Sequence, residues 1–184
     1  MTMNRESTKD RRSIRLTGYD YSLPGAYFIT LVVQHRRCLF GDVSGGEILL
    51  NGAGCLVRDW LQTLPGRYPG LILGSNVIMP NHLHCILEIP EGDVPEQSTM
   101  SLGRIVSWYK AMTTKDYIAG VEQKIYPPFK GRLWQRNYYE HIIRNTKELE
   151  SIRYYIEANP AAWSDDTENP LFPRRPSRQK QGDA

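Results

Sequence analysis

Two apolar runs that meet at a turn constrain the fold of this chain more than any other feature. Residues 71–79 and 82–89 are rich in aliphatic side chains, and Pro80 and Asn81 lie between them. Two such runs around a turn signal predict a β-hairpin, because proline and asparagine favour turns and interrupt strands. Antiparallel pairing is therefore expected in the middle of the chain.

Further strands and helices are expected on both sides of this hairpin. Short apolar or β-branched runs predict three more strands, at residues 27–34, 47–50 and 137–143. Apolar side chains at helical spacing predict three helices, which begin after Asn51, at Ser101 and at Asn145 or Thr146. Turns or loops are predicted at residues 41–46, 90–100 and 120–132, with a helix break at Pro65 and Gly66. This order predicts the α+β class, a sandwich with helices packed on a mostly antiparallel sheet.

Length and composition fit one globular domain. The chain has 184 residues, of which 40% are hydrophobic and 23% charged. The longest strongly apolar stretch, residues 27–33, is too short to span a bilayer, and the N-terminus has no apolar segment typical of a secretory signal. The three cysteines form no Cys-x-x-Cys pair, so neither disulfides nor a cysteine zinc site is expected. We therefore expect a cytoplasmic protein without a membrane partner.

Positive charge gathers in three parts of the sequence. Residues 1–16 carry five basic and two acidic side chains, residues 101–153 ten and five, and residues 174–184 four and one. We expect residues 1–16 to form a basic flexible arm, 17–163 the functional domain, and 164–184 a tail that is basic from residue 174. Basic bands attract polyanions, of which nucleic acid is the commonest large one, although charged tails can also serve solubility alone.

His82 and His84 are the first candidates for a metal site. Alternate residues of a strand point to the same face, so both imidazoles project together while Leu83 points into the core. Two imidazoles on one face can hold one metal ion, but a His-x-His pair alone is weak evidence and needs a third ligand. By the same alternation Cys85 is expected in the core rather than as a nucleophile.

The last predicted helix offers a phenol and a carboxamide near its buried side. Its apolar stripe consists of Leu149, Ile152 and Ile156. At about 100° per residue, Tyr155 falls beside this stripe, Tyr154 falls nearly opposite, and Asn159 shares a face with Tyr155. Tyr155 and Asn159 could therefore look into a site, although a tyrosine at a core boundary often only packs its ring.

Aromatic and basic side chains interleave between residues 130 and 144. Trp134, Tyr138 and Tyr139 lie among Arg132, Arg136 and Arg144. Such a pattern suits single-stranded nucleic acid, because rings stack on bases while cations bind phosphates, and it is equally typical of ordinary sheet aromatics. The sequence contains no Gly-x-Ser-x-Gly, His-Glu-x-x-His, P-loop or dinucleotide-binding motif, which excludes the enzymes that depend on them.

Four motifs follow one another in a specific order. They are Met79-Pro80-Asn81-His82-Leu83-His84, Leu133-Trp134-Gln135-Arg136, His141-Ile142-Ile143-Arg144-Asn145 and Tyr154-Tyr155-Ile156-Glu157-Ala158-Asn159-Pro160. This combination resembles the single-tyrosine transposases of the HUH class, and within it the REP-associated tyrosine transposases, over roughly residues 17–163. The acidic stretch after Pro160 departs from many relatives, which are more basic there, so their DNA contacts are not carried over to it.

The resemblance implies a fold, a cofactor and a partner. The implied fold is a ferredoxin-like or RRM-like α+β sandwich. His82 and His84 match the paired metal ligands, Asn159 matches a third polar ligand, and Tyr155 matches the nucleophile, with Tyr154 as its rival. The implied cofactor is Mg²⁺ or Mn²⁺, and the implied partner is single-stranded or hairpin DNA, bound by a monomer or a homodimer.

The expected function is cleavage and rejoining of single-stranded DNA at hairpin repeats through a 5′-phosphotyrosine intermediate. The basic residues predicted to contact DNA are Arg132, Arg136, Arg144, Arg174, Arg175 and Arg178. One alternative is a catalytically idle nucleic-acid-binding module on the same fold. Another is a zinc or iron enzyme for a small molecule, which would need a further histidine or carboxylate close to the histidine pair.

Overall fold

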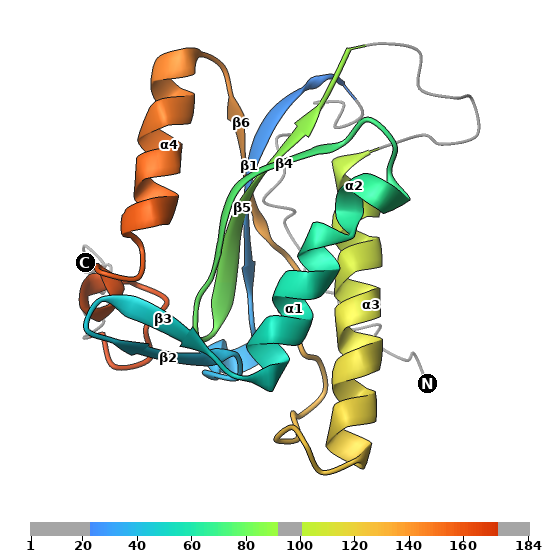
Figure 1. Ribbon diagram of the computed structural model, residues 1–184, viewed down its shortest axis with the longest axis vertical. Helices are drawn as coiled ribbons and strands as arrows, with labels where there is room; N and C mark the ends of the chain where they lie inside the picture. The colour runs from blue at the N-terminus through green and yellow to red at the C-terminus, as the bar shows by residue number, and fades with distance from the viewer. Residues whose placement is uncertain (1–22, 92–100, 173–184) are drawn as a thin grey trace, which may run out of the picture.

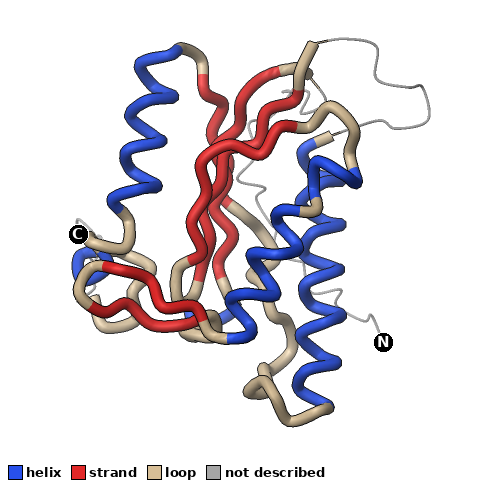
Figure 2. Tube along the Cα trace, in the orientation of Figure 1, coloured by secondary structure: helices blue, strands red, loops and turns tan. Residues whose placement is uncertain are grey.

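A four-stranded antiparallel sheet forms the centre of the computed structural model, which describes residues 23–91 and 101–172 (Figure 1). The strands lie in the order β4 (Ile72–Ile78), β5 (His82–Ile89), β1 (Gly25–Val32) and β6 (Tyr139–Ile143). Helices α1 (Gly52–Gln62) and α3 (Leu102–Glu122) lie on one side of this sheet, and α4 (Thr146–Ala158) lies on the other (Figures 1 and 2). The predicted α+β class with a mostly antiparallel sheet is confirmed.

The predicted hairpin is formed by β4 and β5. Val77 lies opposite His84 and Ile78 opposite Leu83, and the Met79 amide donates to the His82 carbonyl at 2.8 Å where the turn closes. Strand β1 pairs with the other edge of β5, so that β5 has a neighbour on each side. Both histidines therefore lie on an inner strand of the sheet rather than on an edge strand.

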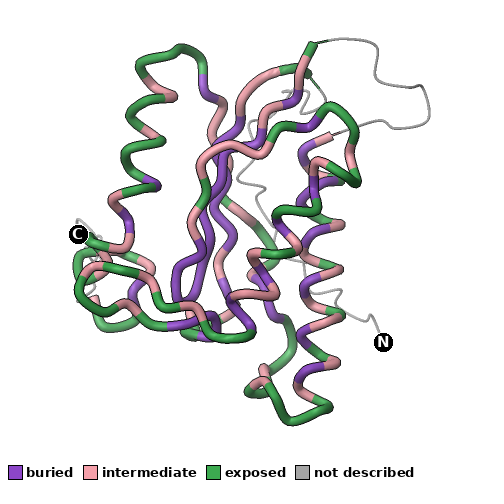
Figure 3. Tube along the Cα trace, viewed as in Figure 1, coloured by how far each residue is buried: buried purple, intermediate pink, exposed green. Residues whose placement is uncertain are grey.

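Most residues along β1 and β5 are buried (Figure 3), and the two faces of the sheet bury different ones. The face toward α1 and α3 carries the main core, to which β5 contributes Leu83 and Cys85 and β1 contributes Ile29 and Leu31. The predicted inward direction of Leu83 and Cys85 is therefore confirmed. A much smaller apolar cluster lies under α4, and it consists of Phe28, Ile86, Ile143 and Ile156.

Asparagines begin two of the helices. The Asn51 side chain accepts hydrogen bonds from the amides of Ala53 and Gly54 at the start of α1. Asn145, rather than Thr146, caps α4 and accepts from the Glu148 amide at 2.9 Å. Each cap satisfies amides that the first helical turn leaves without partners.

Residues 41–46, predicted to be a turn region, contain a strand instead. β2 (Gly41–Ser44) pairs with β3 (Glu47–Leu50) in a separate two-stranded sheet. Gly45 and Gly46 have φ angles of 60° and 80°, which suits the tight turn of a hairpin. The glycines therefore mark the centre of a hairpin rather than a longer loop.

The second predicted helix extends beyond its predicted end. α3 runs to Glu122, although residues from 120 onward were expected in a loop. Gly120 suggested a break, yet here it makes room for a neighbouring ring, because a Cβ atom at this position would lie 2.2 Å from the Tyr126 side chain. The predicted break lies where α1 ends at Gln62, and Pro65 and Gly66 themselves belong to a separate short helix, α2 (Leu64–Arg67), with Pro65 in its first turn. None of the described helices is long and apolar enough to cross a membrane.

Candidate active site

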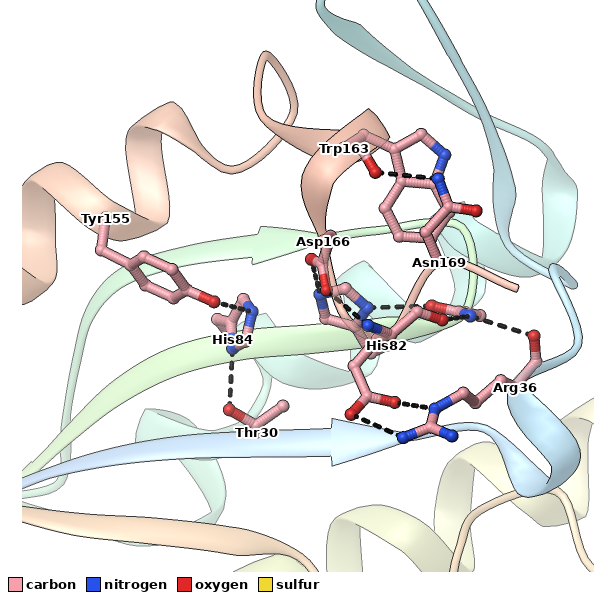
Figure 4. A network of polar contacts seen from close by, with 10 residues as sticks. Thr30, Arg36, His82, His84, Tyr155, Trp163, Asp166 and Asn169 are labelled. Atoms are coloured by element: carbon pink, nitrogen blue, oxygen red, sulfur yellow. Dashed lines mark hydrogen bonds and ion pairs between the residues drawn. The ribbon is translucent and has the colours of Figure 1, made fainter. Parts of the chain in front are cut away.

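His82 and His84 project from β5 on the face that α4 covers (Figure 4). Their rings lie 4.6 Å apart between centroids, and the two residues are 0% and 4% exposed. The common direction follows from strand alternation, as the sequence predicts. Because both imidazoles are buried, their ring nitrogens need hydrogen-bond partners or another ligand.

The Nδ1 atom of each ring is tied to the scaffold. His84 Nδ1 lies 2.8 Å from Thr30 Oγ1, which comes from the neighbouring strand β1. His82 Nδ1 lies 2.9 Å from Oδ1 of Asn81 in the hairpin turn. Bonds of this kind fix the orientation of a ring and leave its Nε2 atom for another ligand.

A carboxylate joins the histidine pair from the segment that follows α4. The chain turns back through η2 (Trp163–Asp165) and places Asp166 beside the two rings. The Asp166 Oδ2 atom lies 3.6 Å from His82 Nε2, and the ligand atoms of all three residues lie within 4.8 Å of one another. The sequence pattern does not point to Asp166, because it lies in an acidic stretch after Pro160 that no local period connects with β5.

Tyr155 reaches the same place from α4. Its hydroxyl oxygen lies 3.4 Å from His84 Nε2, and its ring meets the His84 and Phe28 rings edge to face. Tyr155 is 47% exposed, whereas Tyr154 is 74% exposed, so the helix turns the two phenols in different directions as its phase predicts. Of the two, Tyr155 is the one beside the histidines.

Asn159 is buried at the C-terminal end of α4, next to His82 and Tyr155. Among the described residues its Oδ1 atom has no hydrogen-bond partner. The structure thus brings Asn159 to the histidine pair together with Asp166, a carboxylate that the sequence did not point to.

Burial sets the protonation of these groups. Desolvation lowers the pKa of His82, although the Asp166 and Glu168 carboxylates act in the other direction. Desolvation and the neighbouring His82 hold the pKa of His84 well below its ordinary value. Burial raises the pKa of Tyr155, with Asp166 adding to the effect. The imidazoles are therefore neutral, the form that binds metals, and the phenol keeps its proton at neutral pH.

These residues fit a divalent cation. The buried atoms His82 Nε2, Asp166 Oδ2 and Asn159 Oδ1 have no hydrogen-bond partner in the described parts of the chain. Buried polar atoms are normally paired, so unpaired atoms on residues in and next to the histidine pair are what a cation-binding site would show. Nitrogen and oxygen donors together suit Mg²⁺, Mn²⁺, Zn²⁺ or Fe²⁺.

A hollow of about 560 Å³ opens beside the histidines. Its lining includes His84, Tyr155 and Asp166, together with Gln135 and Tyr139. A hollow of this size is large enough for a small ligand or one nucleotide. The pocket therefore gives access from outside to the Tyr155 phenol and to two of the candidate metal ligands, His84 and Asp166.

A basic groove of about 620 Å³ adjoins this pocket and shares Gln135 with it. Lys110 and Lys115 of α3 line one wall, and Arg132 and Arg136 line the other, with no acidic side chain among the residues that line it. Another hollow, of about 650 Å³, continues past Arg132 and Arg136 to Lys130.

The predicted DNA-contact residues are therefore not all in one place. Arg132 and Arg136 line the basic groove, whereas Arg144 follows β6 and lines none of these three hollows. Arg174, Arg175 and Arg178 lie outside the described residues.

Comparison with known proteins finds a matching family model, similar sequences and a similar solved structure. The family model described as "Transposase IS200 like" matches residues 68–159, which include both histidines, Tyr155 and Asn159. An uncharacterised protein of Haemophilus influenzae is 37% identical over 85% of this chain and 91% of its own length. A REP-associated tyrosine transposase of Escherichia coli K12 is 31% identical over 76% of this chain and 68% of its own length. A solved REP-associated tyrosine transposase bound to a REP hairpin superposes with a TM-score of 0.54 at 25% identity, over 83% of this chain and 79% of that one.

Proposed function

Because this chain belongs to the IS200-like transposase family, we propose that it cleaves and rejoins single-stranded DNA at hairpin repeats, with Tyr155 as the nucleophile. The observation that carries the proposal is the position of the Tyr155 hydroxyl, 3.4 Å from His84 Nε2 and at the wall of the pocket that Asp166 also lines. A nucleophile, a metal-binding cluster and an opening for substrate thus meet at one point.

The reaction follows from the chemistry of a phenol and a phosphodiester. The Tyr155 oxygen loses its proton and attacks the phosphorus, and the bond from phosphorus to the 3′ oxygen breaks. The departing 3′ oxygen takes up a proton, and the 5′ phosphate stays on the tyrosine. A DNA 3′ hydroxyl later attacks this phosphotyrosine and reverses the exchange. The number of phosphate ester bonds is unchanged at each step, so the reaction requires no ATP.

His82, His84, Asp166 and Asn159 would hold the divalent cation, which by family resemblance is Mg²⁺ or Mn²⁺. Such an ion, when bound, polarises a non-bridging phosphate oxygen and neutralises charge that develops in the transition state. The raised pKa of Tyr155 makes this help necessary, because a protonated phenol is a poor nucleophile. Phe28 and His84 hold the phenol ring in place by edge-to-face contacts.

We assign the DNA backbone to the basic groove beside the pocket. Lys110 Nζ donates to the Gln135 and Arg136 carbonyls at 2.6 and 3.1 Å, so it lies against the segment that joins the groove to the pocket. Burial and the nearby Arg132 lower the pKa of Lys110 to about 8. Cations crowded together without a lining carboxylate favour an anionic ligand, and a DNA phosphate leaving the pocket past Gln135 would meet them. The DNA contact of Arg144 and of the three arginines after residue 173 stays a prediction.

The decisive experiment looks for the covalent intermediate. The full chain is incubated with Mn²⁺ and a single-stranded hairpin oligonucleotide labelled on its 3′ side, and adducts are separated on a denaturing gel. Wild-type protein should form a labelled adduct, Tyr155→Phe should form none while it still binds the oligonucleotide, and the matched control Tyr154→Phe should behave as wild type. An adduct that persists in Tyr155→Phe and disappears in Tyr154→Phe would reverse the assignment.

Two other outcomes would point to other functions. Binding of the hairpin without any adduct in wild-type protein would indicate a catalytically idle DNA-binding module. The His-His-Asp cluster also provides the carboxylate that a zinc or iron enzyme for small molecules would need. Tight zinc binding together with no affinity for DNA would favour that second candidate.

A further inference from the structure

Asn81 is fully buried in the hairpin turn and makes three polar contacts. Its amide nitrogen donates to the Arg36 carbonyl at 3.0 Å and to the Glu168 carbonyl at 2.8 Å. Carbonyl oxygens only accept hydrogen bonds, so these two contacts decide which end of the amide is nitrogen. The remaining end, Oδ1, faces His82 Nδ1 at 2.9 Å and can only accept, so Nδ1 must carry the proton.

This assignment determines the chemistry of the other His82 nitrogen. In a neutral imidazole one nitrogen carries the proton and the other has the lone pair. With the proton on Nδ1, the lone pair is on Nε2, the atom that lies 3.6 Å from Asp166 Oδ2. The tautomer set by Asn81 is therefore the one in which His82 can bind a metal ion together with Asp166.

An ion pair holds the segment that carries Asp166. Arg36 donates through Nε and Nη2 to the two carboxylate oxygens of Glu168 (Figure 4). The Glu168 amide in turn donates to Asp166 Oδ1 at 2.7 Å, which leaves Oδ2 directed to the histidines. Arg36 ends η1 (Gln34–Arg36) and has a φ of 54°, a conformation that non-glycine residues rarely adopt.

We propose that Asn81, Arg36 and Glu168 are positioning residues of the metal site: Asn81 keeps His82 in the tautomer with a free Nε2 lone pair, and the Arg36–Glu168 pair keeps Asp166 beside it. This inference rests on the proposed function, because it concerns the same metal site. If this network served only the stability of the fold, its buried polar atoms would be expected to be paired. Instead, His82 Nε2 and Asp166 Oδ2 have no hydrogen-bond partner within the described residues. The network therefore keeps His82 Nε2 and Asp166 Oδ2 close together and available to bind the same metal ion.

The ion pair can be tested by charge reversal on the full chain. Arg36→Glu and Glu168→Arg should each lower the Mn²⁺ affinity measured by calorimetry by about 10–100-fold, the range that loss of such supporting contacts causes at metal sites. The double variant Arg36→Glu/Glu168→Arg should recover most of that loss. The matched control is Arg58→Glu, which breaks an exposed ion pair with Asp59 on α1 and should leave the Mn²⁺ affinity unchanged.

The tautomer can be tested without metal or DNA. Long-range ¹H–¹⁵N spectra of the metal-free protein should show His82 protonated on Nδ1, and a proton on Nε2 would overturn the role of Asn81. Unchanged Mn²⁺ affinity in both single charge reversals, in a protein that still forms the Tyr155 adduct, would overturn the role of the ion pair and leave the proposed function standing. Absence of the adduct in wild-type protein that shows the expected tautomer and Mn²⁺ affinities would instead count against the proposed function alone.

Discussion

The two faces of the central sheet differ in what covers them. On one face α1 and α3 bury a continuous apolar core that takes in every second residue of β1 and β5. On the other face α4 covers only a small apolar cluster, and Thr30, His82 and His84 are buried beyond it. A single strand, β5, therefore supplies core residues to one side and the two histidines of the candidate metal site to the other.

This difference separates the residues that stabilise the hairpin from those to which the proposed function assigns chemistry. On the core side an unpaired polar group or a cavity would lower stability, because this face is stabilised mainly by apolar burial. On the α4 side, buried atoms such as His82 Nε2 and Asp166 Oδ2 have no hydrogen-bond partner within residues 23–91 and 101–172, whereas buried polar atoms are normally paired. Neighbouring positions on β5 should therefore respond to substitution in opposite ways.

The largest expected effect is the loss of metal binding when either histidine is removed. His82→Ala and His84→Ala should each weaken Mn²⁺ binding by more than about 100-fold, beyond the cost of losing an outer supporting contact. The folded state should survive, because neither ring belongs to an apolar cluster. Calorimetry with Mn²⁺ measures the first effect and thermal unfolding the second; unchanged affinity in both variants would remove the metal site.

Leu83→Ala, between the two histidines, should do the reverse. Leu83 is fully buried in the main core, so its truncation should lower the free energy of unfolding by about 2–5 kcal/mol. Mn²⁺ affinity at a temperature where the variant is folded should stay near the wild-type value. Denaturant titration gives the stability. A variant that lost metal affinity as strongly as His84→Ala would show that the two faces are not independent.

Deletion of residues 174–184 should change DNA binding rather than chemistry. This stretch carries four basic residues and one acidic residue, and it lies outside the described residues. Loss of two to four phosphate contacts should flatten the slope of log affinity against log salt by roughly 1.5–3 units on single strands. The cleavage rate at saturating DNA should hardly change, and an unaltered salt slope would assign the charge of this stretch to solubility.

The smallest expected effect is a pH dependence of DNA binding that comes from Lys110. Its pKa of about 8 means that the ammonium loses its charge as pH rises through that value. A bound phosphate favours the charged form, so affinity should fall between pH 7 and pH 9, by about tenfold or 1.4 kcal/mol for one charge-assisted contact. Lys110→Met should bind DNA less tightly at pH 7, and its DNA affinity should no longer show the fall between pH 7 and pH 9 that Lys110 causes. The control Lys115→Met should bind less tightly but retain it. Fluorescence anisotropy with a labelled oligonucleotide, recorded from pH 7 to pH 9, measures the DNA affinity of each variant and its pH dependence.

Much of the fold was predictable because the relevant signals are local. The hairpin around Pro80 and Asn81, the caps Asn51 and Asn145, and the inward direction of Leu83 depend on turn chemistry, capping and strand alternation. The errors came from glycines whose role a local pattern does not settle. Gly120 is typical of a helix end, yet it lies inside α3, where the Tyr126 ring of the following segment fills the space that a Cβ atom would occupy.

The sequence by itself determined which side chains share a face: His82 with His84 on a strand, and Tyr155 with Asn159 on a helix. These relations follow from the repeat of two residues in a strand and of 3.6 in a helix, so they do not depend on where the strand or the helix packs. Only the tertiary structure decided that Asp166 meets the histidines and that Asn81 contacts Arg36 and Glu168. No local period links these residues, because their meeting depends on how the chain after α4 folds back across the end of the sheet.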